Sequence, residues 1–190
     1  MKNKYIQKLV LSAMLLATGL LLPFLTGQLQ QFGNMLLPMH IPVMLCGLIC
    51  GQWYGLGVGF ILPLMRSALF SMPVFYPNAV SMAFELAAYG FIIGLLFNRA
   101  KWKCIRSLYR CMLISMLGGR AVWGLVQALL ALISGGVFTP EAFITYAFLN
   151  AIPGIIIQLI LIPSIMLALH KTHLVHFGKN KHKEIKTDAD

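Results

Sequence analysis

Charged side chains are scarce in this sequence, and acidic ones are the scarcest. Only 11% of the 190 residues are charged and only five are acidic, whereas 59% are hydrophobic. A soluble domain of this size could neither bury so much apolar surface nor stay dissolved with so little charge. The composition therefore excludes an ordinary soluble protein and indicates a chain whose solvent is the lipid bilayer.

The sequence also lacks the residue groups that most enzymes require. It has no paired carboxylates, no Ser-His-acid set, no nucleophile beside a base and no histidine-rich metal spacing within its apolar runs. It has no Gly-rich phosphate loop or Walker pattern, so any work driven by ATP needs a partner. We therefore expect a protein that is not an enzyme, holds no cofactor or metal ion, and has no nucleic acid as partner.

Cysteines are few, and their positions suggest packing rather than chemistry. Cys46 and Cys50 fall inside an apolar run, and Cys104 and Cys111 lie within or beside a basic loop. None of the four has His or an acidic residue at metal-ligand spacing. We expect reduced cysteines that pack against apolar neighbours.

Six apolar runs, bounded by Gly, Pro, Asn or charged residues, predict helices that cross the membrane. They cover approximately residues 9–25, 41–53, 56–72, 79–97, 108–133 and 142–169. The second and third runs are short and close together, so they form a tight hairpin or a partly re-entrant pair. The predicted fold is an all-α integral membrane protein, a six-transmembrane-helix bundle in residues 1–170, followed by a basic cytoplasmic tail in residues 171–190.

The first apolar run follows three lysines, an arrangement that secretory signals share. A cleaved signal needs a small-residue cleavage site just after the run, and residues 23–28 offer a poor one. We therefore expect this segment to stay as the first helix.

The positive charges predict how the chain lies in the membrane. Thirteen of the fifteen Lys and Arg form three groups: Lys2, Lys4 and Lys8; Arg99, Lys101, Lys103, Arg106 and Arg110; and Lys171, Lys179, Lys181, Lys183 and Lys186. Lys and Arg are retained on the cytoplasmic side during insertion. Six crossings place all three groups, and both termini, in the cytoplasm, and we expect the tail to be a frayed end that touches anionic lipid headgroups.

The opposite connections, residues 26–40, 73–78 and 134–141, contain no Lys or Arg. The first is long and half apolar, so we expect it to fold back on the protein. In the second, the rings of Phe75 and Tyr76 either bury themselves against the protein or belong to the aromatic belt at the membrane interface.

Three ionisable residues remain at membrane depth: Arg66, Glu85 and Arg120. A charge in hydrocarbon is costly and persists only with a partner or beside a wet cavity. Arg66 and Glu85 are predicted at similar depth and could form a buried ion pair, but the sequence does not show which arginine pairs with Glu85. One Glu cannot neutralise two Arg, so the surplus positive charge favours an anionic or strongly polar ligand.

Further polar residues lie on the last two predicted helices. Arg120, Trp123 and Gln127 share one stripe, which indicates a pocket wall. Asn150 and Gln158 share another face, either as ligand contacts or as hydrogen bonds between helices.

His40 precedes the second predicted helix at its external end. It could touch a ligand or be a solvated cap, and the cap is the favoured interpretation.

Ala13 and Ala17, followed by Thr18-Gly19, form a small face on the first predicted helix that another helix could approach closely. With this motif, the sequence resembles the substrate-binding S components of energy-coupling-factor (ECF) transporters. The resemblance also includes the basic cytoplasmic face, the stretch 37–42, the glycines from Gly51 to Gly59 and the stretch 63–67. In that family an Ala-x-x-x-Ala motif on the first helix docks on a transmembrane coupling subunit. Ala13 and Ala17 match this motif.

The resemblance implies a vitamin held near the external side by helices four to six and capped by the first and third loops, here residues 26–40 and 73–78. Carried over by position, the lining candidates are Glu85, Tyr89, Arg120, Trp123, Gln127 and Asn150, to which Arg66 and His40 are added as substrate-binding candidates. It further implies a partner module of one coupling subunit and two ATPases, and transport by tipping in the bilayer.

We therefore predict a multi-pass subunit of the cell membrane that captures a water-soluble vitamin or precursor, with pantothenate favoured because of the surplus arginine. The alternative is a stand-alone secondary transporter or proton-coupled carrier in which Glu85 titrates.

Overall fold

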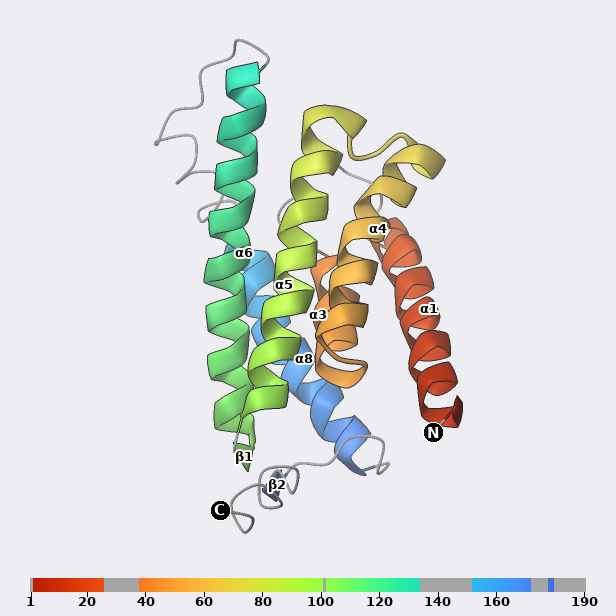
Figure 1. The fold of residues 1–190 in the computed structure, drawn as a ribbon, viewed down its shortest axis with the longest axis vertical. Helices are drawn as coiled ribbons and strands as arrows, with labels where there is room; N and C mark the ends of the chain where they lie inside the picture. Colours follow the sequence, from red (N-terminus) through yellow and green to blue (C-terminus); the bar gives the residue numbers. More distant parts are fainter. Residues whose placement is uncertain (1, 26–37, 101, 134–151, 172–177, 180–190) are drawn as a thin grey trace.

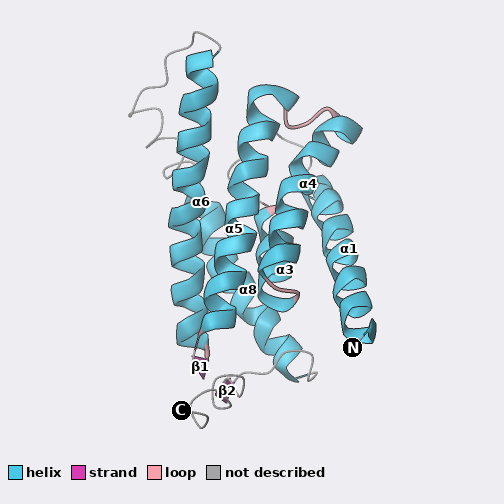
Figure 2. Cartoon of the chain, viewed as in Figure 1, coloured by secondary structure: helices cyan, strands magenta, loops and turns pink. Residues whose placement is uncertain are grey.

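The chain folds into a bundle of helices that run roughly along one axis (Figure 1). The computed structural model describes residues 2–25, 38–100, 102–133, 152–171 and 178–179, and most of this part is helical (Figure 2). The elements are α1 (Lys2–Leu25), α3 (His40–Ile49), α4 (Gln52–Phe70), the π-helical turn η1 (Phe75–Ala79), α5 (Val80–Arg99), β1 (Trp102–Lys103), α6 (Ile105–Ile133), α8 (Ile152–Lys171) and β2 (Gly178–Lys179).

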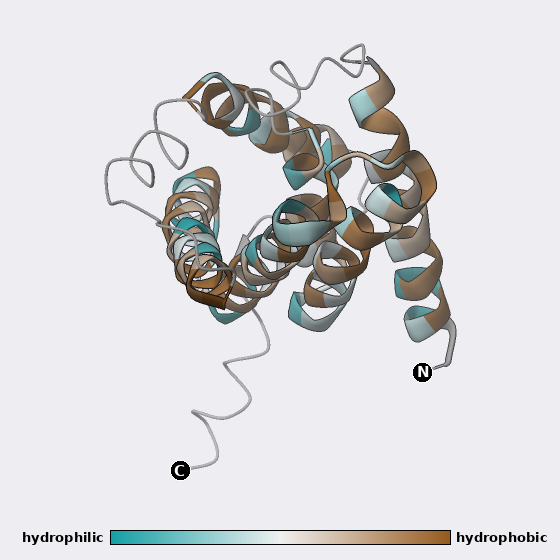
Figure 3. Ribbon diagram, turned by 90° about the horizontal axis from the view of Figure 1, so that it is seen from above, coloured by the Kyte–Doolittle hydropathy of each residue, from teal (hydrophilic) through white to brown (hydrophobic). Residues whose placement is uncertain are grey.

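Five segments in the described part are long and apolar enough to cross a membrane. They are Lys4–Phe24, Gln52–Phe70, Phe75–Arg99, Ile105–Ile133 and Ile152–Lys171. Many large hydrophobic side chains on these segments are exposed, and hydrophobic residues make up much of each helix when the bundle is viewed end-on (Figure 3). A surface of this kind fits lipid and not water, so the all-helical membrane fold is confirmed.

The predicted second helix differs from the expectation. It begins at His40 and ends at Ile49, and its 10 residues extend about 15 Å, half of the roughly 30 Å hydrocarbon core. Gly51 then turns the chain with a φ of 109°, a conformation that favours glycine, so that α4 begins at Gln52. The two helices form a tight hairpin with a shorter first arm, and the residues that precede it, 26–37, lie outside the described part.

The short helix α3 is the centre of the bundle. Every residue from His40 to Leu48 is buried, and α1, α4, α5 and α8 all pack against this helix. One face of α3 joins the apolar cluster formed with α5, α6 and α8, and another joins the cluster formed with α1, α4 and α5. Cys46 and Cys50 belong to the second cluster, and all four cysteines are free thiols. Cys46, Cys50 and Cys111 are buried as predicted, whereas Cys104 is exposed, so the prediction that it packs against apolar neighbours is wrong.

Helices α4 and α5 touch through their backbones. A Cβ atom built at Gly90 on α5 would overlap the carbonyl group of Gly55 on α4, and one built at Gly59 would overlap the carbonyl group of Leu86. Small residues at such positions let membrane helices approach closely. This contact fixes the position of α5, the helix that carries Glu85.

The described members of the three basic groups lie at one end of the bundle. The start of α1, the link between α5 and α6, and the end of α8 meet there (Figure 1). The ammonium group of Lys103 lies 5.5 Å from the ring centroid of Phe97, and partial burial together with the nearby Lys8 lowers the pKa of Lys103. The opposite end is formed by the end of α1, the link from α4 to α5, and the end of α6.

Part of the tail contributes to the same basic end. Gly178 and Lys179 form β2, which pairs antiparallel with β1 through Lys103 and Trp102. At these two residues the expectation of a frayed tail is wrong, because backbone pairing holds them to the link between α5 and α6. Residues 172–177 and 180–190 lie outside the described part.

Candidate functional site

Glu85 is the acidic residue around which the polar interior is built. It lies on α5, about 8 Å from the beginning of that helix, and its side chain is only 2% exposed. A carboxylate so deeply buried needs a partner of opposite charge or several hydrogen bonds. The structure provides such a partner on the neighbouring helix.

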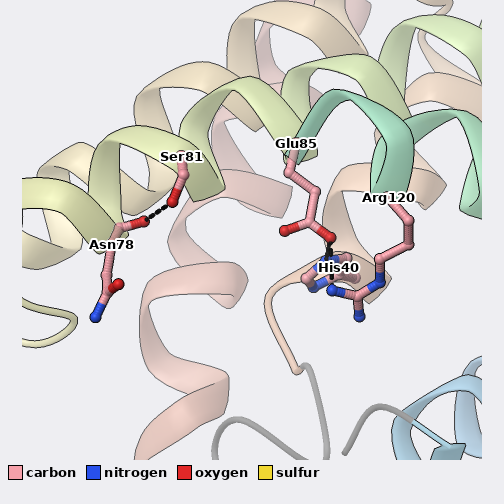
Figure 4. A network of polar contacts seen from close by, with 5 residues as sticks. All are labelled: His40, Asn78, Ser81, Glu85 and Arg120. Carbon is pink, nitrogen blue, oxygen red and sulfur yellow. Dashed lines mark hydrogen bonds and ion pairs between the residues drawn. The ribbon is translucent and has the colours of Figure 1, made fainter. Parts of the chain in front are cut away.

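Arg120 pairs with Glu85. Its Nη1 lies 2.9 Å from Oε1 of Glu85, and both side chains point to the same place between α5 and α6 (Figure 4). Arg120 is near the middle of the 29-residue helix α6, about 20 Å from either end, and is 6% exposed. The question that the sequence left open, which arginine meets Glu85, is therefore answered in favour of Arg120.

Arg66 lies elsewhere in the bundle. Its Nη1 donates a hydrogen bond to the carbonyl oxygen of Leu20 on α1, at 2.8 Å. Its guanidinium carbon lies 5.3 Å from the ring centroid of Phe24 and 5.6 Å from that of Phe70, and these two rings pack edge to face. The predicted possibility of an Arg66–Glu85 pair is therefore wrong, and Arg66 instead ties α4 to α1.

His40 is a member of the charged group, and its interpretation as a solvated cap is wrong. The side chain is 1% exposed, and its Nε2 lies 3.5 Å from the same oxygen of Glu85 that Arg120 faces. The imidazole packs edge to face on the ring of Tyr89, with centroids 4.9 Å apart and an interplanar angle of 83°. We call His40, Glu85, Tyr89 and Arg120 the polar cluster.

The polar cluster needs a glycine beside it. Tyr89 is 2% exposed, and its ring packs against α6 at Gly119, where an added Cβ would come within 2.6 Å of two ring carbons. The glycine that precedes Arg120 in the sequence thus makes room for the ring on which His40 rests. In this way α3, α5 and α6 all contribute to one set of contacts.

Several buried nitrogen and oxygen atoms, most of them in the polar cluster, have no hydrogen-bond partner within the described residues. They are Nδ1 and Nε2 of His40, Oε1 of Glu85, Nε and Nη2 of Arg120, Oε1 of Gln127 and Nε2 of Gln158. Leaving one such group unsatisfied costs about 1–3 kcal/mol. A bundle that retains several of them has donors and acceptors available for a polar molecule.

The predicted stripe on α6 is only partly buried. Trp123 and Gln127 follow Arg120 on this helix with intermediate exposure, and Gln158 on α8 is 1% exposed. Asn150, the remaining lining candidate, lies outside the described residues, so the structure does not place it.

The link between α4 and α5 lies at the end of the bundle nearest Glu85. The hydroxyl of Tyr76 donates to the carbonyl oxygen of Leu130 on α6 at 3.3 Å, and the hydroxyl of Ser67 donates to that of Pro73 at 2.7 Å. Phe75 and Tyr76 are nevertheless 58% and 46% exposed. Of the two interpretations of these aromatics, the interfacial belt fits their exposure better.

A surface hollow of about 260 Å³ lies at the basic end and not at the polar cluster. It is lined by Ala100, Trp102, Cys104, Arg106, Ser107 and Arg110, around the link from α5 to α6. These residues precede Arg120 by ten positions or more on the chain, so this hollow belongs to a different surface. In the described part of the chain no group of three or more metal-ligating residues occurs.

The outer face of α1 carries the predicted small residues. Ala13 and Ala17 are exposed, whereas Ser12 and Gly19 face the bundle. A Cβ at Gly19 would come within 2.7 Å of Leu62, so Gly19 serves internal packing and the two alanines do not.

Comparison with known proteins gives one match. Residues 7–166 match the family model described as ECF transporter, substrate-specific component. No curated protein and no solved structure gave a match. The matched range runs from α1 into α8 and includes every residue of the polar cluster.

Proposed function

Because the chain belongs to the family of ECF transporter substrate-specific components, we propose that it captures a water-soluble vitamin or vitamin precursor for uptake into the cell. Members of this family are multi-pass membrane subunits that bind a substrate and work with an ECF module. In our proposal the substrate enters from outside, the subunit lies in the cell membrane, and partner ATPases perform the hydrolysis.

The observation that supports a binding role is the polar cluster with its unpartnered donors. Arg120 and His40 are almost completely buried, and several of their nitrogen atoms have no hydrogen-bond partner in the described part of the chain. A pair that served folding alone would gain stability from satisfying those atoms. An anionic or strongly polar micronutrient, of which pantothenate is one, would supply the missing acceptors.

We propose that the substrate is lined by Glu85, Tyr89, Arg120, Trp123, Gln127 and His40, and that Asn150 joins them. Arg66 was a candidate as well, but its guanidinium already donates to Leu20 and lies beside two phenylalanines. It therefore has less reason than Arg120 to meet a substrate.

The partners and the orientation are part of the proposal. We propose one transmembrane coupling subunit and two ATPases, with docking through Ala13 and Ala17 and transport by tipping of the subunit in the bilayer. Residues 1–170 act as one membrane domain, and residues 171–190 as a basic tail. The three basic groups, whose described members lie at one end of the bundle, support a cytoplasmic location for both termini.

A binding scan tests the proposed function. Purified protein in lipid nanodiscs is titrated with the water-soluble vitamins, and we expect one of them to bind with nanomolar to micromolar affinity. Arg120→Met should weaken that binding roughly hundredfold or more, because the substrate and Glu85 both lose a buried positive charge. Arg66→Met is the matched control, since it removes the same group from a buried site outside the polar cluster, and it should retain binding.

The scan has two outcomes that would contradict the proposal. One is the absence of binding by every vitamin tested, provided that the protein remains folded. The other is an equal loss of affinity in Arg120→Met and Arg66→Met, which would point to general destabilisation rather than to contact with the substrate.

A second candidate function is a stand-alone, proton-coupled carrier. The contact between His40 and Glu85 at membrane depth favours it, because both groups can exchange protons. Proteoliposomes that contain this chain alone would then accumulate substrate when a proton gradient is applied. Uptake that needs the ECF module and ATP would exclude this alternative.

A further inference from the structure

A single carboxylate oxygen in the polar cluster faces two groups that can carry positive charge. Oε1 of Glu85 lies 2.9 Å from Nη1 of Arg120 and 3.5 Å from Nε2 of His40 (Figure 4). Neither contact has the direction of a hydrogen bond, since Oε1 and both ring nitrogens remain without such a partner. Glu85 is thus placed to exchange one partner for the other by a small movement.

The unpartnered atoms of Arg120 form one edge of its guanidinium. Nη1 faces Glu85, and the hydroxyl of Tyr89 also lies within interaction range of the guanidinium, whereas Nε and Nη2 are buried and make no well-formed hydrogen bond among the described residues. The N–H bonds of Nε and Nη2 point to the same side of the planar group. Two parallel donors of this kind match the two oxygens of a carboxylate.

The charge of the polar cluster limits what can bind there. Arg120 contributes one positive charge and Glu85 one negative charge, and His40 adds a positive charge only when it carries a second proton, so the cluster with a neutral imidazole has no net charge. A carboxylate placed on Arg120 would leave one uncompensated negative charge in a buried site, where charge is costly. One proton on His40 restores the balance, and histidine is the side chain that most readily takes up a proton near neutral pH.

We propose that the polar cluster binds a monocarboxylate together with one proton, with the carboxylate on the Nε and Nη2 edge of Arg120 and the proton on His40. Glu85 then pairs with the imidazolium as Arg120 turns toward the ligand. The proton comes from the aqueous phase, no covalent bond changes, and the cluster stays neutral. This inference rests on the proposed function and adds to it the charge of the substrate and the role of His40.

The other elements packed on α3 present no competing charge to His40 in the described part of the chain. From α5 it faces Glu85 and Tyr89, and through Glu85 it faces Arg120 on α6. Arg66 on α4 is turned toward Leu20. The titratable groups of α8, His170 and Lys171, lie in its last turn, and those of α1 lie in its first two turns, where Lys8 is near Cys50 at the end of α3 opposite His40.

Matched pairs of compounds test the proposal. The protein in nanodiscs is titrated by calorimetry at pH 7.5 with pantothenate and panthenol, nicotinate and nicotinamide, and biotin and biotin amide, in phosphate and in Tris buffer. We expect one carboxylate to bind about tenfold or more tightly than its neutral counterpart. The binding enthalpy of this carboxylate should differ between the two buffers. Divided by the difference in ionisation enthalpy of the buffers, that difference should correspond to the uptake of nearly one proton per ligand.

Two variants separate His40 from the rest of the site. His40→Gln should bind the same carboxylate more weakly and with no proton uptake, because glutamine cannot be protonated. Ser81→Ala is the control. Ser81 is buried on the same helix as Glu85, but its hydroxyl donates to the carbonyl oxygens of Asn78 (Figure 4) and Pro77, so proton uptake should persist. Should His40→Gln fail to fold, the wild-type affinity for the carboxylate must still rise as the pH falls from 8.5 to 6.5.

Three results would overturn the inference. A carboxylate that binds with equal heat in both buffers, or with an affinity independent of pH, would exclude the role of His40. Binding of only uncharged vitamins would exclude the carboxylate but leave the proposed function intact. Binding of no vitamin at all would remove the proposed function, and this inference with it.

Discussion

Gly90 has almost no space around it, because the backbone of α4 touches it at Gly55. Gly90→Ala should therefore destabilise the protein by about 1–3 kcal/mol, since the added methyl group forces α4 and α5 apart. Gly57→Ala is the matched control: Gly57 lies on α4 with no heavy atom within 4 Å of an added Cβ, and alanine favours the helix by about 1 kcal/mol.

Thermal unfolding in detergent, followed by circular dichroism, measures both variants. We expect a lower Tm for Gly90→Ala and an unchanged or higher Tm for Gly57→Ala. Equal values for the two variants would mean that the close contact between α4 and α5 does not exist in solution.

For individual residues, the sequence predicted which side chains carry charge at membrane depth but not how they pair. Arg66, Glu85 and Arg120 were found because charges stand out in apolar runs. Their pairing depends on the direction in which each side chain leaves its helix and on which helices are neighbours, and neither is visible in a single sequence. His40 was misjudged for a related reason, because its position at a helix start suggested solvent, whereas α3 starts inside the bundle.

Among the elements, α1 has two distinct faces. Its inner face packs on α3 and α4, and its outer face presents Ala13 and Ala17. Under the proposed function a partner helix approaches these alanines, so Ala13→Trp should abolish copurification of the coupling subunit while substrate affinity stays within about twofold. The bulky side chain would fill the space that the partner needs without entering the bundle.

A tryptophan on another lipid-facing helix is the control for this experiment. Leu125 on α6 is 72% exposed, so Leu125→Trp places the same ring on the outer surface away from α1. Copurification should survive this change. If Ala13→Trp also retains the coupling subunit, the docking role of α1 is refuted.

The boundaries of the elements show what hydropathy can and cannot predict. The predicted runs 56–72, 79–97 and 108–133 correspond to α4, α5 and α6 within a few residues. The run 41–53 became the shorter helix α3, because Gly51 takes a positive φ that ends it, and mean hydropathy does not detect such a turn. The run 142–169 matches α8 from residue 152 onward, and its first part lies outside the described residues.

For the whole molecule, the distribution of charge predicts the orientation in the membrane. Cys104 is exposed at the basic end, and Asn78 is exposed at the opposite end. In intact cells a membrane-impermeant maleimide should label the Asn78→Cys variant but not the wild-type protein, and Cys104 should react only after permeabilisation. The other three thiols are buried, which keeps the background low.

Cys104→Ser supplies the control for this labelling, because it should remove the signal that appears on permeabilisation. Labelling of Cys104 in intact cells would mean that the orientation is the opposite of the one proposed. The sequence was sufficient for this prediction because the charge rule depends on connections and not on side-chain packing.

The contact between Arg66 and Leu20 has a mechanical consequence. Arg66 holds α1 to α4 at the end opposite the basic groups, through a hydrogen bond to the carbonyl oxygen of Leu20 and through contacts with the rings of Phe24 and Phe70. A force applied to the exposed side of α1 is therefore transmitted to α4, and from α4 to α5 through the contact between Gly55 and Gly90. If a partner docks on α1 as proposed, these contacts connect that helix to the rest of the bundle, so that the subunit moves as one rigid body.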